Sequence, residues 1–511
     1  MKHVVMSFTV LSALSVGLAL SSVSARDASA EVIFDPAVNF LVGTSPWSVV
    51  IDDLNGDGKP DLAVTNEHSD DISVLLGNGD GTFGTSTNFA AGNTPRFLAV
   101  HDLNGNGKPD LVATNSDDNS STNDSVAVLL GNGDGTFGVA ANYAVRVQPI
   151  SVAIDDIDND GKPDLAVVNE TSQNVSVLLG NGDGTFGTAV HFSALTFPRS
   201  VAIGDLNDDG KLDLAVAGRF PSRVSVLLGN GDGTFGGATT FGVGTGDEPR
   251  SVAIGDLNDD GKLDLAVANT DGDNDFTDDV LAVLLGNGDG TFGAAANFTA
   301  NQGPFAVAIS DLNDNGKLDL VVANILSDDV SVLLGNGDGT FGAATNFVVG
   351  GGPKTVAISD LNGDVKPDLA IANSTSDDIS VLIATSPDSD GDGINDEDDN
   401  CPMEDATGLD ADQDGCIDNA QGLIDLINDL PPEAIDEQLK NSLISKITNA
   451  ENQASKENIC SAVNVLESFQ NQVEAQRGNK ITDETATLLI SYADNLITLF
   501  LLELPTGETC N

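Results

Sequence analysis

Basic residues are scarce in this chain: 21 Lys and Arg stand against 79 Asp and Glu, and the formal net charge is -58. Nucleic acids and anionic membrane surfaces bind clusters of Lys and Arg, so this composition argues against both as partners. It favours cations instead. Because hydrophobic residues still make up 40% of the chain, the sequence does not read as a disordered acidic tail.

Catalytic signatures are also missing. The four histidines, His3, His68, His101 and His191, fall near the N-terminus or at unrelated positions of the repeat described below. The patterns HExxH and GxSxG and a phosphate-binding loop do not occur. Carboxylates are so frequent that their pairing says nothing about acid–base catalysis. We therefore predict that the protein is not an enzyme.

Long apolar runs are confined to the N-terminus. Lys2 precedes an apolar run over residues 4–20, and small residues end it at Ala25, with a second small-residue site ending at Ala30. This order is typical of a cleaved signal peptide, which we place at residues 1–30. The alternative is an uncleaved anchor, which the shortness of the run disfavours. We expect a secreted or cell-surface protein without a transmembrane segment.

Cysteine is limited to four residues in the last quarter of the chain, Cys401, Cys416, Cys460 and Cys510. Export makes disulfides plausible, and four cysteines allow three pairings. Proximity in sequence favours Cys401–Cys416, which leaves Cys460–Cys510.

The chain does contain a repeat of about fifty residues. Each unit has a run such as "SVAIDDL", an acidic turn such as "DLNGDGKPDL", then "ISVLLGN", "GDG" and "TFGTSTNF". Short Val-, Ile- and Leu-rich runs separated by Gly, Asn and Asp predict strands and turns. Four strands per unit are typical of a propeller blade. Two insertions, at residues 116–124 and 270–279, are expected between second and third strands.

The ends of the array predict how it closes. The acidic turn occurs seven times, but "LGNGDGTFG" occurs six times and is missing from the last unit. The segment "FDPAVNFLVG" (34–43) matches "FGAATNFVVG" (341–350) at six of ten positions. We therefore predict a mainly β fold, a seven-bladed propeller over residues 31–385 whose last blade is completed by the N-terminal strand. A β-solenoid is the alternative, but it does not explain the split repeat.

The acidic turn has the spacing of a calcium loop. Counted from its first Asp, oxygen-bearing side chains fall at positions 1, 3, 5 and 9, with Gly at position 6. Calcium binds six to eight oxygens at about 2.3–2.6 Å. Position 7 supplies its backbone carbonyl, so the Lys found there is expected to point its side chain away. A plain Asx-rich turn is the alternative, but it does not require three acidic positions that repel one another.

The predicted calcium ligands, with the position-7 carbonyl included, form seven sets. They are Asp53, Asn55, Asp57, Lys59 and Asp61; Asp102, Asn104, Asn106, Lys108 and Asp110; Asp156, Asp158, Asp160, Lys162 and Asp164; Asp205, Asn207, Asp209, Lys211 and Asp213; Asp256, Asn258, Asp260, Lys262 and Asp264; Asp311, Asn313, Asn315, Lys317 and Asp319; and Asp360, Asn362, Asp364, Lys366 and Asp368.

These sets are not equivalent. The third has four carboxylates, whereas the second and sixth have two each, so the third is expected to bind calcium most tightly. The seventh carries Val365 where the others have Gly, which puts its loop geometry in question. The second insertion repeats the spacing at Asp271, Asp273, Asp275 and Asp279, but with Phe276 at the Gly position.

The units resemble FG-GAP/VCBS repeats, the type that forms the calcium-loaded propeller of integrin α-subunits. "GDGTFG" supplies the FG part and "DLNGDGKPDLAV" the calcium-loop part, over about two-thirds of the chain. The resemblance implies calcium loops between the first and second strands of blades. It also implies a role in adhesion or ligand binding, and in that family the fold occasionally accompanies hydrolases or lyases.

A short acidic segment follows the propeller at residues 386–420. "DSDGDGINDEDDNCP" and "DADQDGCID" repeat the oxygen spacing and resemble thrombospondin type-3 repeats, in which calcium and a disulfide order a segment with little apolar core. The alternative is a flexible linker. The ligands expected here are Asp388, Asp390, Asp392 and Asp396, and Asp410, Asp412, Asp414 and Asp418.

The remaining residues, 421–511, show helical periodicity. Apolar residues recur every three to four positions in three stretches, around Leu443, Leu466 and Leu489. Pro431 and Pro432 precede the first stretch, and Gly478 separates the second from the third. We expect a small helical bundle with these stripes as its core. "NQVEAQRGNKIT" resembles the FIMAH domain found at the ends of exported microbial proteins.

These features predict a secreted or surface calcium-binding protein whose propeller serves as a non-catalytic adhesion or protein-interaction module. A lectin-like polysaccharide binder is the alternative, although Trp47 is the single Trp and Tyr143 and Tyr492 the two Tyr. The 21 Phe fall largely at repeated positions, which indicates packing. A calcium-dependent polysaccharide lyase is the third possibility. The partner is expected to be an extracellular protein or glycan.

Overall fold

The computed structural model describes residues 32–116, 124–220, 222–244, 248–270, 279–385, 420–430, 434–454 and 459–502. The predicted signal peptide and the thrombospondin-like segment lie outside these ranges, as do the insertion residues 117–123 and 271–278. Among the described residues, no helix is long and apolar enough to cross a bilayer.

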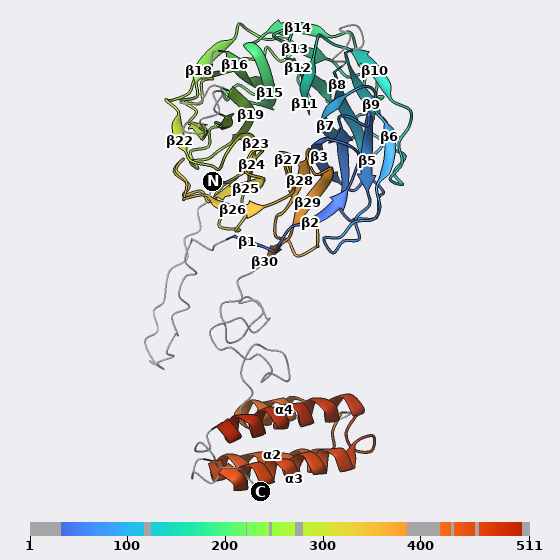
Figure 1. Cartoon of the computed structure of the whole chain (residues 1–511), viewed down its shortest axis with the longest axis vertical. Coiled ribbons are helices and arrows are strands. Elements are labelled where there is room, and N and C mark those ends of the chain that lie inside the picture. The colour runs from blue at the N-terminus through green and yellow to red at the C-terminus, as the bar shows by residue number, and fades with distance from the viewer. Residues whose placement is uncertain are drawn as a thin grey trace, which may run out of the picture.

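Seven four-stranded antiparallel sheets form a closed ring (Figure 1). The innermost strands are β3 (Pro46–Asp52), β7 (Pro95–His101), β11 (Pro149–Asp155), β15 (Thr196–Gly204), β19 (Glu248–Gly255), β23 (Pro304–Ser310) and β27 (Pro353–Ser359). The second strands are β4 (Asp61–Asn66), β8 (Asp110–Asn115), β12 (Asp164–Asn169), β16 (Asp213–Phe220), β20 (Asp264–Thr270), β24 (Asp319–Asn324) and β28 (Asp368–Asn373).

The third strands are β5 (Asp71–Leu75), β9 (Ser125–Leu129), β13 (Asn174–Leu178), β17 (Arg223–Leu227), β21 (Val280–Leu284), β25 (Asp329–Leu333) and β29 (Asp378–Leu382). The outer strands of the first six blades are β6 (Thr87–Ala90), β10 (Ala141–Ala144), β14 (Val190–Ser193), β18 (Thr239–Gly242), β22 (Ala296–Phe298) and β26 (Thr345–Val348). The two insertions lie between second and third strands, as predicted.

The seventh blade is completed by the N-terminal segment, as the split repeat predicted. Strand β2 (Val38–Leu41) pairs with β29, and the short strand β1 (Ile33–Phe34) pairs with β30 (Ala384–Thr385). The fold is therefore a mainly β seven-bladed propeller, closed by pairing of its two ends, and not a solenoid.

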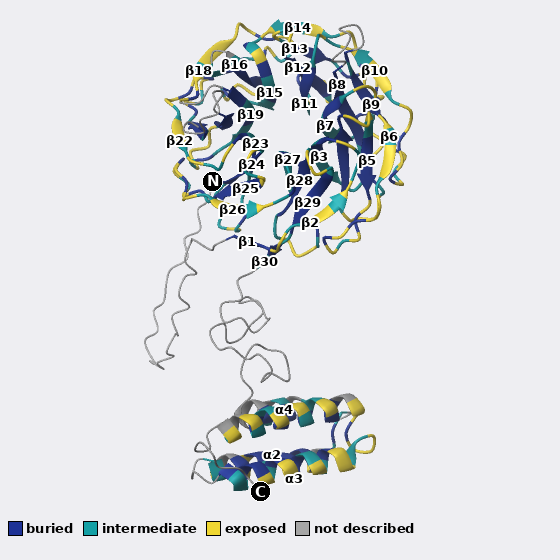
Figure 2. Ribbon diagram, viewed as in Figure 1, coloured by how far each residue is buried: buried dark blue, intermediate teal, exposed yellow. Residues whose placement is uncertain are grey.

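Burial follows strand position within a blade. Every residue of β4 is buried, because the sheet packs between two neighbouring blades and both faces of its second strand are covered. The outer strand β6 is mostly exposed. Figure 2 shows dark strands in the middle of the blades and a yellow outer rim. It explains why the second strands are almost continuously apolar.

Aromatic pairs fasten each blade to the next. The Phe of one outer strand meets the Phe of the next blade's "TFG" segment edge-to-face; for example, Phe89 and Phe137 have ring centroids 5.5 Å apart. The equivalent pairs are Phe40–Phe83, Tyr143–Phe186, Phe192–Phe235, Phe241–Phe292, Phe298–Phe341 and Phe34–Phe347. Phe34 thus supplies the ring that the shortened seventh unit lacks. The prediction that repeated Phe residues serve packing is confirmed.

The C-terminal region is helical: α1 (Ala420–Asp429), α2 (Glu437–Ala454), α3 (Ile459–Gln476) and α4 (Asp483–Leu502). Leu443, Leu466, Phe469 and Leu489 share one buried core, which confirms the predicted stripes. Cys460 is disulfide-bonded. The other three cysteines lie outside the described residues, so the two pairings remain predictions.

Replacement of Phe34 by Ala tests ring closure. Phe34 is 7% exposed and its loss leaves a cavity beside Phe347, so unfolding of the propeller should become easier by about 3 kcal/mol. Leu41→Ala in β2 is the control, because Leu41 is 76% exposed and should change stability by less than about 0.5 kcal/mol. Urea unfolding followed by Trp47 fluorescence measures both, since the single Trp lies in the propeller. Equal effects of the two variants would contradict the closure role of Phe34.

Candidate metal-binding loops

All seven acidic turns join the first strand of a blade to its second strand. The position-9 Asp is in each case the first residue of the second strand, as Asp61 is of β4. The seven turns therefore lie at the same end of the blades, as the resemblance implied. Numbering from the first Asp is kept below.

The position-9 carboxylate is fully buried and held by two backbone amides. One oxygen of Asp61 accepts from Leu54 N at 3.0 Å, and the other accepts from Gly77 N at 2.7 Å. The second amide belongs to the segment after the third strand, so the carboxylate links the turn to the end of the neighbouring third strand of its own blade. In the seventh blade, Ala384 N replaces the glycine amide on Asp368 at 2.7 Å.

The position-1 carboxylate organises the rest of the turn. Asp53 accepts from Gly56 N at 2.7 Å, Asp57 N at 3.1 Å and Gly58 N at 2.8 Å. Asn55 in turn accepts from Asp57 N at 2.9 Å. Each carboxylate oxygen has more than one lone pair, so these bonds orient the oxygens and still leave acceptor capacity for a cation.

The third turn brings three carboxylates together. Ligand oxygens of Asp156, Asp158 and Asp164 all lie within 4.8 Å of one another. Oxygens about 2.3–2.6 Å from one calcium ion are separated by at most about 5 Å, so the three fit a shared ion. Among the described residues, this is the one such group of acidic, His or Cys side chains. It falls in the turn with most carboxylates, where position 3 is Asp and not Asn.

The pKa values of the position-9 carboxyls show the cost of this arrangement. Burial raises the pKa of Asp164 to about 6, and the charge of Asp158 adds to the effect. The equivalent Asp61, Asp213, Asp264 and Asp368 also have pKa values raised to about 6 by burial and then by neighbouring carboxylates. A bound cation would offset this crowding of negative charge.

The position-5 carboxylate and the position-7 Lys differ from expectation. The ammonium group of Lys162 contacts Asp160 at 2.5 Å, and Lys211 and Lys262 contact Asp209 and Asp260 at 3.2 Å. The prediction that these side chains point away is wrong for these three turns. A Lys ammonium is long enough to fold back onto the nearest exposed carboxylate, an interaction worth little at the surface.

Two positions of the turn adopt left-handed backbone, where the sequence argument foresaw one. Position 6 does so at Gly58, with φ of 82°, and position 4 does so at Gly56, with φ of 77°. Position 4 is Gly, Asn or Asp in all seven turns, the residue types that tolerate this conformation. That restricted choice was the signal that could have revealed it.

The Val365 turn keeps the geometry of the others. Val365 has φ of 74°, and its amide donates to Asp360 at 2.9 Å, as Gly58 donates to Asp53. The amide bond to the carboxylate therefore holds a β-branched residue in a region that such residues rarely adopt. The substitution strains this turn without rearranging it.

A backbone hydrogen bond joins five of the seven turns to the next blade. The carbonyl oxygen of Leu54 accepts from Gly135 N at 3.1 Å, and Gly135 belongs to the "GDG" turn of the following blade. A Cβ at Gly135 would lie 2.8 Å from Leu76, and a Cβ at Gly77 would lie 2.0 Å from Pro60 O. Gly77 therefore allows a close backbone approach to the acidic turn, whereas Gly135 is favoured by its left-handed φ of 78°.

Not every predicted ligand is placed. Positions 1, 3, 5 and 9 of all seven turns are described. The eight acidic residues expected to bind calcium in the 386–420 segment lie outside the described residues, as do Asp271, Asp273 and Asp275 of the insertion.

The strain at Val365 can be measured. Val365→Gly should stabilise the propeller by about 1 kcal/mol, because left-handed strain of about 1–2 kcal/mol is relieved and part is lost to unfolded-state entropy. The reverse change, Gly210→Val, should destabilise by a similar amount, because a Cβ there meets nothing within 4 Å and only φ, at 77°, opposes it. Urea unfolding followed by Trp47 fluorescence measures the free energy of unfolding of both variants. A Val365→Gly protein less stable than the parent would contradict the presence of strain at Val365.

Comparisons with known proteins agree with this architecture. Overlapping matches to the FG-GAP-like repeat span residues 53–113, 102–167, 156–216, 205–267, 256–322 and 311–371, and residues 422–498 match the FIMAH domain. A comparison with curated protein sequences finds no match.

Solved structures with a similar fold share little sequence. A BBS1N chain crystallised with ARL6DN is 14% identical, with a TM-score of 0.48, covering 70% of this chain and 98% of that one. The Pseudomonas aeruginosa periplasmic gluconolactonase PpgL is 18% identical, with a TM-score of 0.47, covering 61% and 87%. The repeat matches cover more than half of the sequence, and the chain therefore belongs to the FG-GAP-like repeat family, with a FIMAH domain after its propeller.

Proposed function

We propose that this protein is an exported, calcium-stabilised propeller that acts as a non-catalytic adhesion or protein-interaction module. The observation that carries the proposal is the sevenfold acidic turn, whose buried Asp is bonded within its blade while the turn contacts the next blade. A cation held there would stabilise the whole ring. The faces of the ring are then free to recognise a partner.

Calcium fits the donor set better than other ions. The candidate ligands are carboxylate, amide and backbone carbonyl oxygens, which hard cations prefer, and no turn contains His or Cys. Calcium also accepts irregular coordination, whereas magnesium requires near-octahedral geometry. Asp156, Asp158 and Asp164 would hold the ion in the third turn, and the bound ion would supply positive charge to the crowded carboxylates.

The histidines offer no support for catalysis. His191 contacts Ser176 on the outer part of the third blade at 2.9 Å, and His101 is exposed beside the second acidic turn. His68 lies in the turn after β4 in the first blade. These three side chains come from different blades and different strand positions, so they support a structural role and not a shared catalytic centre.

Removal of calcium should destabilise the propeller. A ligand present at 100 times its Kd contributes about 2.7 kcal/mol per site, so EDTA should lower the melting temperature of the Trp47-monitored transition markedly. The Asp158→Asn variant should lose the tightest site in a calcium titration, because the third turn then has the donor set of the fourth. Asp80→Asn is the control, since Asp80 bonds Thr82 in an exposed turn. Unchanged melting with EDTA, together with no metal in the purified protein, would refute calcium binding.

The effect of pH should have opposite signs with and without calcium. The folded-state pKa of about 6 for Asp61 lies above the ordinary 3.8, so the fold prefers the protonated carboxyl. In metal-free protein, ionisation of these buried carboxyls destabilises the fold. This destabilisation reaches its full size above about pH 6 and is lost as the pH falls toward 4. The metal-free propeller should therefore become more stable between pH 7 and pH 5, while protons should weaken calcium binding in the same range. Thermal melting with and without EDTA at each pH measures both effects. Parallel curves of melting temperature against pH would contradict the idea that the same carboxylates bind protons and calcium.

The interaction role is tested by capture. The calcium-loaded protein, immobilised through its C-terminus, is expected to retain a surface protein that is released by EDTA. A glycan array tests the lectin alternative, and a turnover assay on pectin-like polymers tests the lyase alternative. Product formation in that assay would overturn the non-catalytic proposal, and glycan binding without protein capture would favour the lectin.

A further inference from the structure

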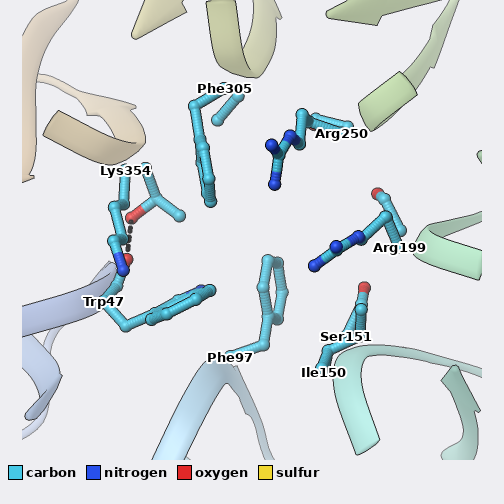
Figure 3. Close-up of a pocket in the computed structure, with 12 residues that line it drawn as sticks. Trp47, Phe97, Ile150, Ser151, Arg199, Arg250, Phe305 and Lys354 are labelled. Carbon is cyan, nitrogen blue, oxygen red and sulfur yellow. Dashed lines mark hydrogen bonds between the residues drawn. The ribbon is translucent and has the colours of Figure 1, made fainter. Parts of the chain in front are cut away.

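A pocket lies on the propeller axis, at the opposite end of the inner strands from the acidic turns. Its volume is about 450 Å³, including the part open to solvent, and its lining includes Trp47, Phe97, Arg199, Arg250 and Lys354. We call it the axial pocket. Figure 3 shows these side chains converging from separate blades. Five residues of β3, from Ser48 to Asp52, separate Trp47 from the first acidic turn, which corresponds to about 20 Å of extended strand.

A backbone irregularity aims these side chains. Each inner strand has a Pro near its start, and the strand pairing shifts register directly after that Pro, as between Pro46 and Ser48. The skipped residue is Trp47, Ile150, Arg199, Arg250, Phe305 or Lys354, and in the second blade it is the pair Arg96 and Phe97. Bulges re-aim side chains and concentrate near functional sites.

The residue before the Pro is strained in four blades. Ser45, Thr94, Gln148 and Phe197 have φ between 49° and 64°. Non-glycine residues rarely adopt this conformation, least of all a β-branched Thr. Strain at equivalent points around one pocket indicates that the fold maintains the pocket geometry.

The bulge residue after each Pro is also the position at which the residue type varies from blade to blade. Around it the inner strands read "PWSVV", "PRFLA", "PISVA", "PRSVA", "PRSVA", "PFAVA" and "PKTVA". A purely structural position would carry similar residues in each blade, as the buried second strands do. Here the residue at the bulge is cationic in three blades, aromatic in two and aliphatic in one, and the second blade has the Arg–Phe pair.

Cationic side chains gather around the axial pocket, in a chain whose net charge is -58. In the ion pairs between described residues, five cations share three carboxylates. The cations are Arg96, Arg199, Arg219, Arg250 and Lys354, and the carboxylates belong to Glu67, Glu170 and Glu248. The side chains are largely buried: Lys354 is 12% exposed and Arg199 is 20% exposed.

The aromatic rings hold these cations in place. The Lys354 ammonium lies 3.3 Å from the centroid of Trp47, and the Arg96 guanidinium carbon lies 5.1 Å from it. The Arg250 guanidinium carbon lies 5.5 Å from the centroid of Phe305. Ring faces covered by cations are poor platforms for a neutral sugar, so the rings favour an anion-binding role.

The floor of the pocket adds hydroxyl donors. The hydroxyl oxygens of Ser151, Ser200 and Ser251 each accept a hydrogen bond from a backbone amide of the next blade, at 3.3–3.4 Å. A hydroxyl that accepts such a bond still has its own hydrogen to donate. The pocket is thus rich in donors, while Glu67, Glu170 and Glu248 already bind Arg or Lys.

We propose that the axial pocket binds a small organic carboxylate, with Arg199, Arg250 and Lys354 as donors and Phe97 and Ile150 as an apolar wall. Arg side chains match the geometry of a carboxylate. The chain's net charge of -58 would repel a long polyanion, so the ligand is a free acid or a single acidic end group. This inference rests on the proposed function, to which it adds a ligand class.

The first experiment compares matched acids and alcohols by isothermal titration calorimetry, on the full chain with saturating calcium. The pairs are glucuronate with glucose, a sugar, and benzoate with benzyl alcohol, a non-sugar. At least one acid is expected to bind with a stoichiometry of one while its neutral analogue does not, and the pair that responds identifies the source. Binding of neither acid, or equal binding of acid and neutral analogue, would overturn the proposal.

The second experiment uses Arg250→Gln and Lys354→Met with the acid that binds. Glu248 remains paired with Arg219, and Glu67 remains paired with Arg96, so neither variant leaves a buried carboxylate without a cation. Each should weaken binding about tenfold. The control is Arg223→Gln, which removes the same charge from β17, where Arg223 contacts Thr240 at 3.4 Å. Unchanged affinity in both pocket variants would refute the site.

Folding of each variant is checked by its calcium-dependent melting temperature. If melting still depends on calcium and no acid binds, the axial pocket proposal fails while the calcium-stabilised module stands. If melting does not depend on calcium but the acid binds, the calcium-stabilised module fails while the axial pocket proposal stands.

Discussion

A buried carboxylate between two backbone amides is the interaction on which this propeller depends. Asp61 joins the amide of its own turn to that of Gly77, which follows the neighbouring third strand. In the first blade a Cβ at position 77 would meet the Pro60 carbonyl at 2.0 Å, so this approach needs Gly77, whereas Ala384 makes the equivalent bond in the seventh blade. Burial of an anion is costly unless it is well bonded and its charge is offset. The same position therefore organises the blade and creates a demand for a cation.

Closure of the ring follows from the same repetition. Because a blade contacts only its neighbours, each interface is built from elements that recur around the ring. These are a core cluster, an edge-to-face aromatic pair and, at five of the seven interfaces, a hydrogen bond between turns. The seventh unit lacks the "TFG" segment, so Phe34 and β2 replace it from the other end of the chain. Two distant segments then share one blade, and unfolding of either end is coupled to the ring.

Much of this was predictable from the sequence because it is repeated. Seven copies of the acidic turn and a displaced half-repeat predicted blade number, closure and the position of the candidate ligands. What the sequence did not reveal depends on local backbone geometry: the left-handed residue at position 4, the Lys162 contact to Asp160, and the bulge that turns Arg199 and Lys354 toward the axis. In each case the residue is compatible with several conformations, and the fold selects one.

The two ends of the inner strands differ in how far their side chains repeat. One end carries acidic turns that repeat almost without change, as expected for positions that stabilise the scaffold. The other end carries unrepeated side chains on a repeated bulge, with cations such as Arg250 and Lys354 among aromatic rings. A cation bound at the acidic end would restrain the end of each strand, and a restrained strand would fix the position of the side chain at its start. Binding at the axial pocket would in this way depend on the acidic turns through the strand itself, with no contact between the two sites.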